Sequence, residues 1–258
     1  MSSVYRLSCL ASLLVSPILL VQSFGQQGVG PVTLFRGGMI NTPGSYILVR
    51  NIDAGATGIR ITSSGVSLDL NGQQILGPGG KRGTGISIEG ADGVEVRNGT
   101  LANFAFGVVV DNSNNVVLRQ LRIRGEGLAV AAPPPEVGIM IVQSRNVVVA
   151  DNAIYNTGLG VFVRGGQSWG NRIGNNTITA GTNGALGICY NPAPGDDQGP
   201  RADLVFDNVI TGFNTGIQAS VNSMQNLFRG NTISYRVSAI EFLNDTNQDI
   251  DNISALFP

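Results

Sequence analysis

One local pattern recurs along most of the chain and restricts its fold more than any other feature. A small residue, usually glycine, is followed by an apolar, a variable and a second apolar residue, and the next copy begins 22 to 31 residues later. The copies begin at Gly58, Gly85, Gly107, Gly138, Gly160, Gly187, Gly216 and Ala239. A fixed local pattern with a loose period above 20 residues predicts a solenoid whose turns vary in length.

Each copy is followed by a second alternating stretch that closes on an apolar residue, as in residues 94–101 and 116–123. A period of two places alternate side chains on one interior face, as in a strand and not a helix. The sequence therefore predicts an all-β fold, a single-stranded right-handed parallel β-helix of about eight coils. Because one coil buries too little apolar surface to offset its ordering entropy, the coils must stack.

Asparagines recur two positions before the closing apolar residue of four coils, at Asn152, Asn176, Asn208 and Asn231. Asparagine tolerates the left-handed backbone conformation that a sharp turn requires. Stacked amides also hydrogen-bond to one another along a column. We predict that these four residues form an internal structural ladder.

The first 25 residues are typical of a secretory signal peptide. Arg6 is their only charge, residues 7–21 are almost entirely apolar, and small residues at Ser23 and Gly25 precede Gln26. The apolar run is shorter than the ~20 residues that span a bilayer. We expect a signal peptide (1–25), an N-terminal cap with the first coil (26–57), β-helix repeats (58–253) and a C-terminal tail (254–258). A secreted or periplasmic protein without a membrane span follows.

Composition excludes several classes of function. The chain contains no histidine, which removes histidine-dependent hydrolases and histidine-ligated zinc or copper sites. Its formal net charge of −1 argues against nucleic acid, because phosphate binding needs a concentrated positive field. Cys189 would be the single cysteine of the mature chain, so no internal disulfide forms.

The repeat between residues 138 and 154 resembles that of pectin-lyase-like parallel β-helix proteins. Residues 41–46 and 68–72 are similar to segments of uncharacterised secreted bacterial β-helix proteins. The resemblance covers about residues 41–253 and implies the fold, whereas the activities on this fold range from lyases and hydrolases to non-catalytic scaffolds. It also implies a polysaccharide as the partner.

The fourth position of the repeat points outward and stacks Glu89, Asp111 and Arg164 on one face. Glu89 and Asp111 are neighbours in this column, and Arg164 follows two coils after Asp111, at roughly 10 Å. The resemblance implies a calcium-dependent lyase, with Glu89 and Asp111 as calcium ligands and Arg164 as the base. The alternative is an ordinary solvated column with cross-strand charge pairs.

The second position stacks Val109, Met140, Phe162 and Cys189, which are apolar although the pleat directs them outward. Such a stripe indicates a binding groove, with Val109, Met140 and Phe162 as substrate contacts, or a surface covered by the loops at 125–137 and 191–202. Asp196 and Asp197 resemble the paired aspartates of pectin hydrolases. The histidine and Arg-x-Lys that accompany that pair are missing, so we expect a solvated turn there.

Three hypotheses remain open. The exported β-helix binds or acts on polysaccharide along the face that carries Glu89, Asp111 and Arg164, or it is a calcium-dependent lyase of acidic polysaccharides, or it is a surface scaffold without catalysis. Calcium is the cofactor that the second hypothesis requires.

Overall fold

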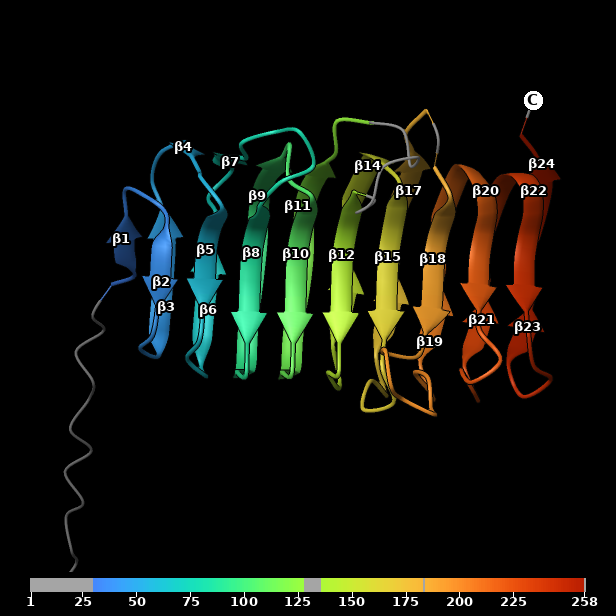
Figure 1. Cartoon of the computed structure of the whole chain (residues 1–258). Coiled ribbons are helices and arrows are strands. Elements are labelled where there is room, and N and C mark those ends of the chain that lie inside the picture. The colour runs from blue at the N-terminus through green and yellow to red at the C-terminus, as the bar shows by residue number, and fades with distance from the viewer. Residues whose placement is uncertain (1–29, 128–135, 183, 258) are drawn as a thin grey trace, which may run out of the picture. The chain divides into compact units, whose positions relative to one another are not determined.

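The computed structural model describes residues 30–127, 136–182 and 184–257, and the compact unit begins at Pro31. All regular structure in these residues is β-strand, wound into coils that stack along one axis (Figure 1). The predicted signal peptide lies outside the described residues. No helix in the described part of the chain is long and apolar enough to cross a membrane.

The first strand of each coil contributes to a front sheet, in which neighbouring strands pair in parallel. Its strands are β2 (Gly38–Ile40), β5 (Thr57–Ile61), β8 (Thr84–Glu89), β10 (Phe106–Asp111), β12 (Val137–Val142), β15 (Leu159–Arg164), β18 (Leu186–Asn191), and the C-terminal parts of β20 (Val209–Ala219) and β22 (Thr232–Phe242).

The second sheet follows the first turn of each coil, and the third sheet closes the coil. The second contains β1 (Val32–Leu34), β3 (Gly44–Leu48), β6 (Val66–Asp69), the first parts of β9 (Asp92–Ala102) and β11 (Asn114–Arg124), β13 (Val148–Ala150), β16 (Arg172–Gly174), β19 (Leu204–Phe206), β21 (Leu227–Arg229) and β23 (Gln248–Ile250). The third contains β4 (Ile52–Asp53), β7 (Gln74–Leu76), the remainders of β9 and β11, β14 (Ala153–Thr157), β17 (Thr177–Ala180), the first parts of β20 and β22, and β24 (Ile253–Leu256).

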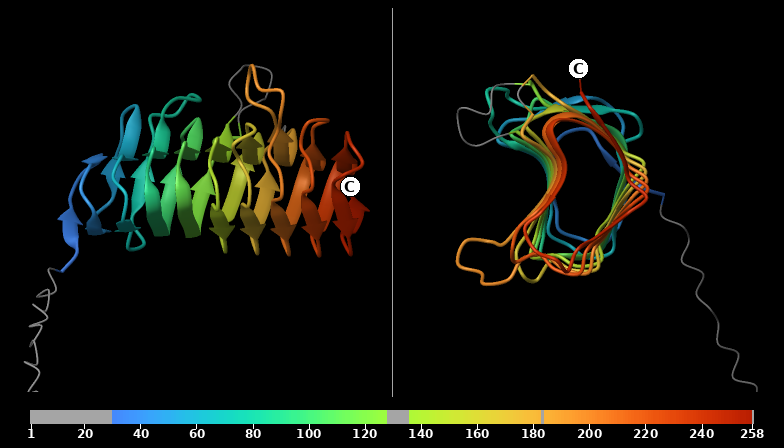
Figure 2. Two further views of the ribbon diagram at one scale, coloured as in Figure 1. Left: turned by 90° about the horizontal axis from the view of Figure 1, so that it is seen from below. Right: turned by 90° about the vertical axis from the view of Figure 1, so that its right-hand side faces the viewer.

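The view along the stack shows that the coils follow one outline (Figure 2, right), and the strand directions in Figure 1 give the winding a right hand. The predicted right-handed parallel β-helix is therefore confirmed. Nine front strands stack in the described residues, because a coil carrying β2 precedes the eight copies of the repeat.

The core is a set of aliphatic columns inside the coils. Ile86 and Ile88 are fully buried, and Ile86 is in register with Val108 of the next coil. Burying each such side chain stabilises the fold by about 1.5–3 kcal/mol before chain entropy is subtracted.

The glycine that opens each front strand is required by the next coil. A Cβ atom on Gly138 would collide with the carbonyl oxygen of Gly160 and with the Ile154 side chain. The final copy begins with Ala239, and no coil of the described chain stacks beyond it. A methyl group is therefore tolerated at that position.

The asparagines at 152, 176, 208 and 231 occupy one buried column at the turn between the second and third sheets. Asn152 donates from its backbone N–H and from Nδ2 to Oδ1 of Asn176, both at 3.0 Å. Asn176 makes the same two bonds to Asn208, which makes them to Asn231. Asn252 extends the column in the last coil. This ladder satisfies backbone groups that the turn would otherwise leave unpaired.

A second buried ladder, which the sequence pattern did not reveal, lies at the turn between the first and second sheets. It consists of Asn171, Asp203, Asn226 and Asn247, and each backbone N–H donates to the side-chain oxygen of the next member. Asp203 replaces an amide in this series, so it can accept hydrogen bonds but lacks the amide donor.

Asp203 is 2% exposed, and burial raises the pKa of its carboxyl from about 3.8 to about 7. Two donors of Asn171 oppose this shift: the backbone N–H at 2.7 Å from Oδ1 and Nδ2 at 3.1 Å from Oδ2. The charge of Asp203 in turn contributes, after burial, to raising the pKa of the fully buried Tyr190. The Tyr190 hydroxyl has no hydrogen-bond partner among the described residues.

We predict that Asn176→Ala destabilises the protein by about 2–5 kcal/mol, because the backbone N–H of Asn152 and Oδ1 of Asn208 both lose partners in the core. Urea unfolding followed by circular dichroism measures the change. Thr177→Ala, at the exposed neighbouring position, is the control and should change stability by less than about 0.5 kcal/mol. Equal losses of stability in the two variants would contradict a stabilising role of the asparagine ladder.

Asp203→Asn should stabilise the protein most at neutral pH. The folded pKa lies above the unfolded one, so native Asp203 holds its proton longer, and the free energy of unfolding falls as pH rises from about 4 to about 7. Asparagine does not titrate, so the variant avoids this loss. Its free energy of unfolding should exceed that of the wild type by about 1–4 kcal/mol at pH 7 and higher, and the difference should disappear near pH 4. Denaturation of both proteins across this range, with the exposed Asp207→Asn as control, measures the gain. A gain independent of pH would refute the explanation.

Candidate functional site

The front sheet around β8, β10, β12, β15 and β18 lies between projecting segments. In the view along the stack, the segment after β7 projects at one edge of this sheet and the segment after β18 at the other (Figure 2, right). The outer face of the front strands therefore lies between two projecting segments, one at each edge of the sheet. The predicted site residues all belong to this face.

Parallel register brings the fourth-position residues into one column. Glu89 pairs with Asp111, Asp111 with Val142, and Val142 with Arg164. Arg164 therefore lies two coils beyond Asp111, at about 10 Å for a strand spacing of about 4.8 Å. The three charged residues share a face, with Val142 between Asp111 and Arg164.

Glu89 is already engaged by its own neighbours. It forms an ion pair with Arg60 and accepts a 2.6 Å hydrogen bond from the Ser87 hydroxyl. The Ser87 hydrogen bond and then the Arg60 guanidinium lower the pKa of Glu89. Glu89 is consequently a carboxylate held in place by the protein.

Asp111 differs from Glu89 although the two are adjacent. Its side chain accepts a hydrogen bond from Asn112 Nδ2 at 2.9 Å. Partial burial, and then the negative charge of Glu89, raise the pKa of Asp111. The column therefore contains an ionised carboxylate, Glu89, whose charge is balanced by Arg60, and a second carboxylate, Asp111, whose ionisation is disfavoured.

Arg164 carries a positive charge that forms no ion pair within the described residues. Its guanidinium carbon lies 5.9 Å from the centre of the Phe162 ring. Its Nε is buried and has no hydrogen-bond partner in the described part of the chain. An unused donor on a charged group is costly to keep, which makes Arg164 the most notable residue on this face.

The apolar stripe forms as the repeat predicts. Val109, Met140 and Phe162 are in register and remain partly exposed, whereas Cys189, next in the column, is 1% exposed. Burial raises the pKa of the Cys189 thiol to about 12, so this cysteine packs as an apolar group. Most of the loop at 125–137 lies outside the described residues. The segment at 191–202 folds against the turns after β12 and β15.

Sequence reasoning missed a hollow beside this face. It has a volume of about 310 Å³ and is lined by Gln143, Gly166, Gln167, Gly195, Asp196, Asp197 and Gln198. Asp196 anchors the insertion although it is partly exposed, because its Oδ2 accepts hydrogen bonds from Gln143 Nε2 at 2.8 Å and Gly166 N at 3.1 Å. The length of the 191–202 insertion was the one sequence feature that pointed to a structure beside this face. It could not indicate where the loop folds.

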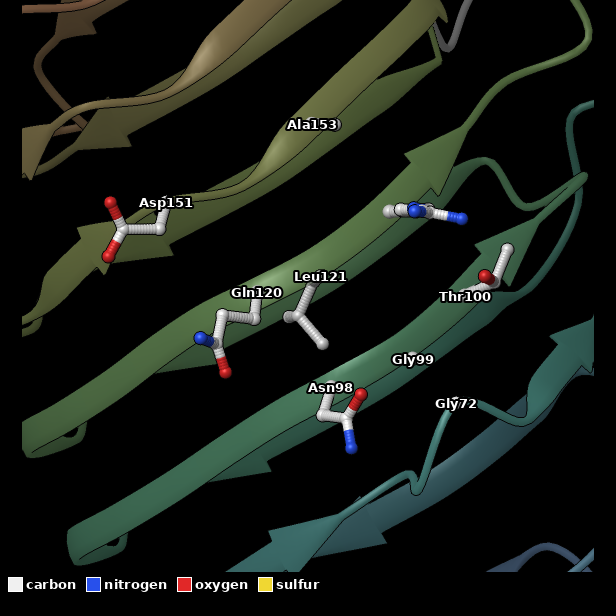
Figure 3. Close-up of a pocket in the computed structure, with 9 residues that line it drawn as sticks. Gly72, Asn98, Gly99, Thr100, Gln120, Leu121, Asp151 and Ala153 are labelled. Carbon is white, nitrogen blue, oxygen red and sulfur yellow. The ribbon is translucent and has the colours of Figure 1, made fainter.

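A larger polar hollow, of about 520 Å³, lies at the turn between the second and third sheets (Figure 3). Asn98, Gln120 and Asp151 follow one another along it, each with a positive φ. These side chains occupy the turn positions that the coil geometry dictates. The front face carries the unpaired arginine and the apolar stripe, so it remains the stronger candidate.

Residues 53–253 match the NosD family, described as periplasmic copper-binding protein. The chain belongs to this family. The description names the periplasm, in agreement with the export predicted from the sequence. No curated protein matches the chain.

Solved structures with the same fold act on or bind carbohydrates, at low sequence identity. An alginate lyase from Paenibacillus sp. str. FPU-7 is 14% identical with a TM-score of 0.59, over 83% of this chain and 91% of that one. An exopolygalacturonase from Thermotoga maritima is 15% identical with a TM-score of 0.53, over 81% of this chain and 54% of that one. The tailspike of E. coli bacteriophage HK620, in complex with a pentasaccharide, is 11% identical with a TM-score of 0.57, over 89% of this chain and 57% of that one.

The residues of this chain do not fit a copper ion. Histidine is absent from the whole sequence, and Cys189 is buried as a thiol. Copper in proteins is held mainly by imidazole, thiolate and thioether groups. No group of three or more Cys, Asp or Glu side chains in the described chain is arranged to hold a metal ion. The family's description therefore does not extend to a copper site built from these side chains, and calcium gains no support either.

We predict that the protein, purified without a histidine tag, retains no stoichiometric copper after equilibrium dialysis against Cu²⁺ at pH 7. Metal content measured by mass spectrometry should stay substoichiometric, because histidine is absent and the Cys189 thiol is buried. One tightly held equivalent per chain would contradict this result. Cys189→Ala would then show whether the thiol supplies the ligand.

Proposed function

We propose that this protein binds an acidic polysaccharide on its front face, with Arg164 as the main contact for the carboxylate groups of the polymer. The single observation that carries the proposal is the state of Arg164: a partly exposed guanidinium without an ion pair in the described chain and with a buried, unused Nε donor. A uronate carboxylate would pair with the exposed part of this guanidinium and balance its charge. Charge-assisted hydrogen bonds of this kind are among the strongest that proteins form.

The apolar stripe supports a sugar and not a free anion as the ligand. Phe162 lies beneath the Arg164 guanidinium, and Met140 and Val109 continue the partly exposed surface toward β10. The less polar face of a pyranose ring packs well on such side chains. Because the coils rise by about 4.8 Å, a distance comparable with the repeat of a sugar chain, a polymer lying along the stack would meet equivalent positions in successive coils.

The carboxylates at the other end of the column suit hydroxyl groups. Asp111 has free acceptor capacity, since Asn112 is its one side-chain hydrogen-bond donor in the described chain. Glu89 is fixed by Arg60 and Ser87. A calcium-dependent lyase would need both carboxylates for the ion, and the engagement of Glu89 disfavours it. The lyase remains an expectation from the resemblance, whereas a scaffold without a ligand leaves the Arg164 donor unexplained.

Arg164→Ala should weaken the binding of oligogalacturonate and alginate oligosaccharides by about tenfold to a hundredfold, because one charge-assisted contact is lost. Isothermal titration calorimetry at low salt measures the dissociation constants. Binding by the wild type should also weaken as salt is added. The control is Arg229→Ala, which removes an exposed arginine of the second sheet and should leave affinity unchanged.

Two results would refute the proposal: no binding of either acidic probe by the wild-type protein, or equal affinity of wild type and Arg164→Ala. Unsaturated products in the same mixtures, detected by ultraviolet absorbance, would add lyase activity to binding.

A further inference from the structure

The hollow beside the front face is shaped by the 191–202 insertion, which folds back on the turns that follow β12 and β15. Asp196 fixes the insertion through Gln143 and the backbone of Gly166. Gln198 packs so closely on Gly166 that an added Cβ there would lie 3.0 Å from the Gln198 Cβ. The wall of the hollow is therefore held in position before any ligand arrives.

Three glutamine amides around the hollow are oriented by the protein. Oε1 of Gln143 accepts a hydrogen bond from the backbone N–H of Gln167 at 2.9 Å. Oε1 of Gln167 accepts from Arg145, and Oε1 of Gln198 accepts from Arg201 at 2.6 Å. With the oxygens used, Nε2 of Gln167 and Nε2 of Gln198 remain as donors, since neither nitrogen makes a hydrogen bond in the described structure.

The two arginines lie in one column of bridged residues, and Arg145 is also restrained by stacking. Bridges between successive coils align Arg145, Trp169 and Arg201 in one column. The Arg145 guanidinium lies 5.3 Å from the centre of the Trp169 ring. Trp169 thus restrains the guanidinium that orients Gln167, and the bridge to Arg201 places the backbone of the arginine that orients Gln198. The amide donors are thus set by a second layer of contacts, which is the arrangement expected of a binding site.

Carboxylate oxygens complete the lining. Oδ1 of Asp196 and the exposed carboxylate of Asp197 have no hydrogen-bond partner in the described residues, and no lysine or arginine is among the lining residues. Amide donors next to carboxylate acceptors match adjacent hydroxyl groups, each of which donates and accepts. The acidic wall would repel an anionic group. A volume of about 310 Å³ is at the lower end for small-molecule sites.

We infer that this hollow is a second sugar subsite, which binds one neutral sugar residue through adjacent hydroxyl groups. The inference rests on the proposed function and deepens it: the acidic part of the polysaccharide lies on the front face, and a neutral residue, such as a branch, enters the hollow. The ligand would then be a heteropolysaccharide with both acidic and neutral sugars.

Saturation-transfer difference NMR with xylose, glucose, galactose, mannose and rhamnose tests the subsite on the full-length mature protein. At least one of these sugars should receive saturation from the wild type, and Asp197→Ala should reduce that signal about fivefold or more. Asp197 is exposed and makes no contact that folding needs, so this variant keeps the fold. Asp245→Ala, an exposed aspartate of the last coil, should leave the signal unchanged.

Arg164→Ala separates this inference from the proposed function. It should leave the neutral-sugar signal intact while it weakens the acidic oligosaccharides. The subsite is overturned if no neutral sugar receives saturation, if Asp197→Ala retains the full signal, or if Arg164→Ala abolishes it. Failure of the acidic probes to bind the wild type, with the neutral signal intact, would instead refute the front-face proposal.

Discussion

Every coil of this protein must turn sharply inside a stack, and the backbone groups at those turns are buried where water cannot reach them. The rest of the structure depends on how these groups are satisfied. At the turn between the second and third sheets, amides of successive coils accept from the backbone N–H of the coil before. Because an unpaired buried donor costs as much as a lost hydrogen bond, the ladder fixes the position of the turn and the register of the neighbouring strands in the coils from Asn152 onward. The front strands of those coils inherit that register.

Much of this arrangement could be predicted from the sequence, because strict periodicity carries it. Glycine at 138 and 160, aliphatics at alternate positions, and asparagines before Ile154 and Ile178 all express contacts that repeat in each coil. The register of Glu89 with Asp111, and of Met140 with Phe162, follows from the same repeat. Features that belong to a single coil were not accessible. The second ladder contains an aspartate at 203, so it does not present a uniform asparagine spacing, and the role of Asp196 depends on where a loop folds.

On the front face, equivalent positions of successive coils have different chemical properties. Neighbouring carboxylates at 89 and 111 have opposite pKa shifts, because one has Arg60 and Ser87 as partners and the other has mainly burial and a like charge. The backbone supplies equivalent positions in each coil, and the side chains make them chemically different. The mismatch between the family's copper description and a chain without histidine is of the same kind, since the shared coil does not carry a shared set of ligands. Function must be argued from the side chains at hand.

The glycine at the start of each front strand has a consequence for how such a chain changes in length. Its missing side chain lets the carbonyl group of the following coil approach closely, and that approach is repeated from Gly58 to Gly216. A residue inserted within a front strand would move a bulky side chain into this contact and shift all that follows. Whole turns of the helix can be gained or lost without that penalty, and so can residues in the connecting segments. Evolution along this chain is therefore expected to proceed in steps of one complete winding, with novelty confined to the outer loops.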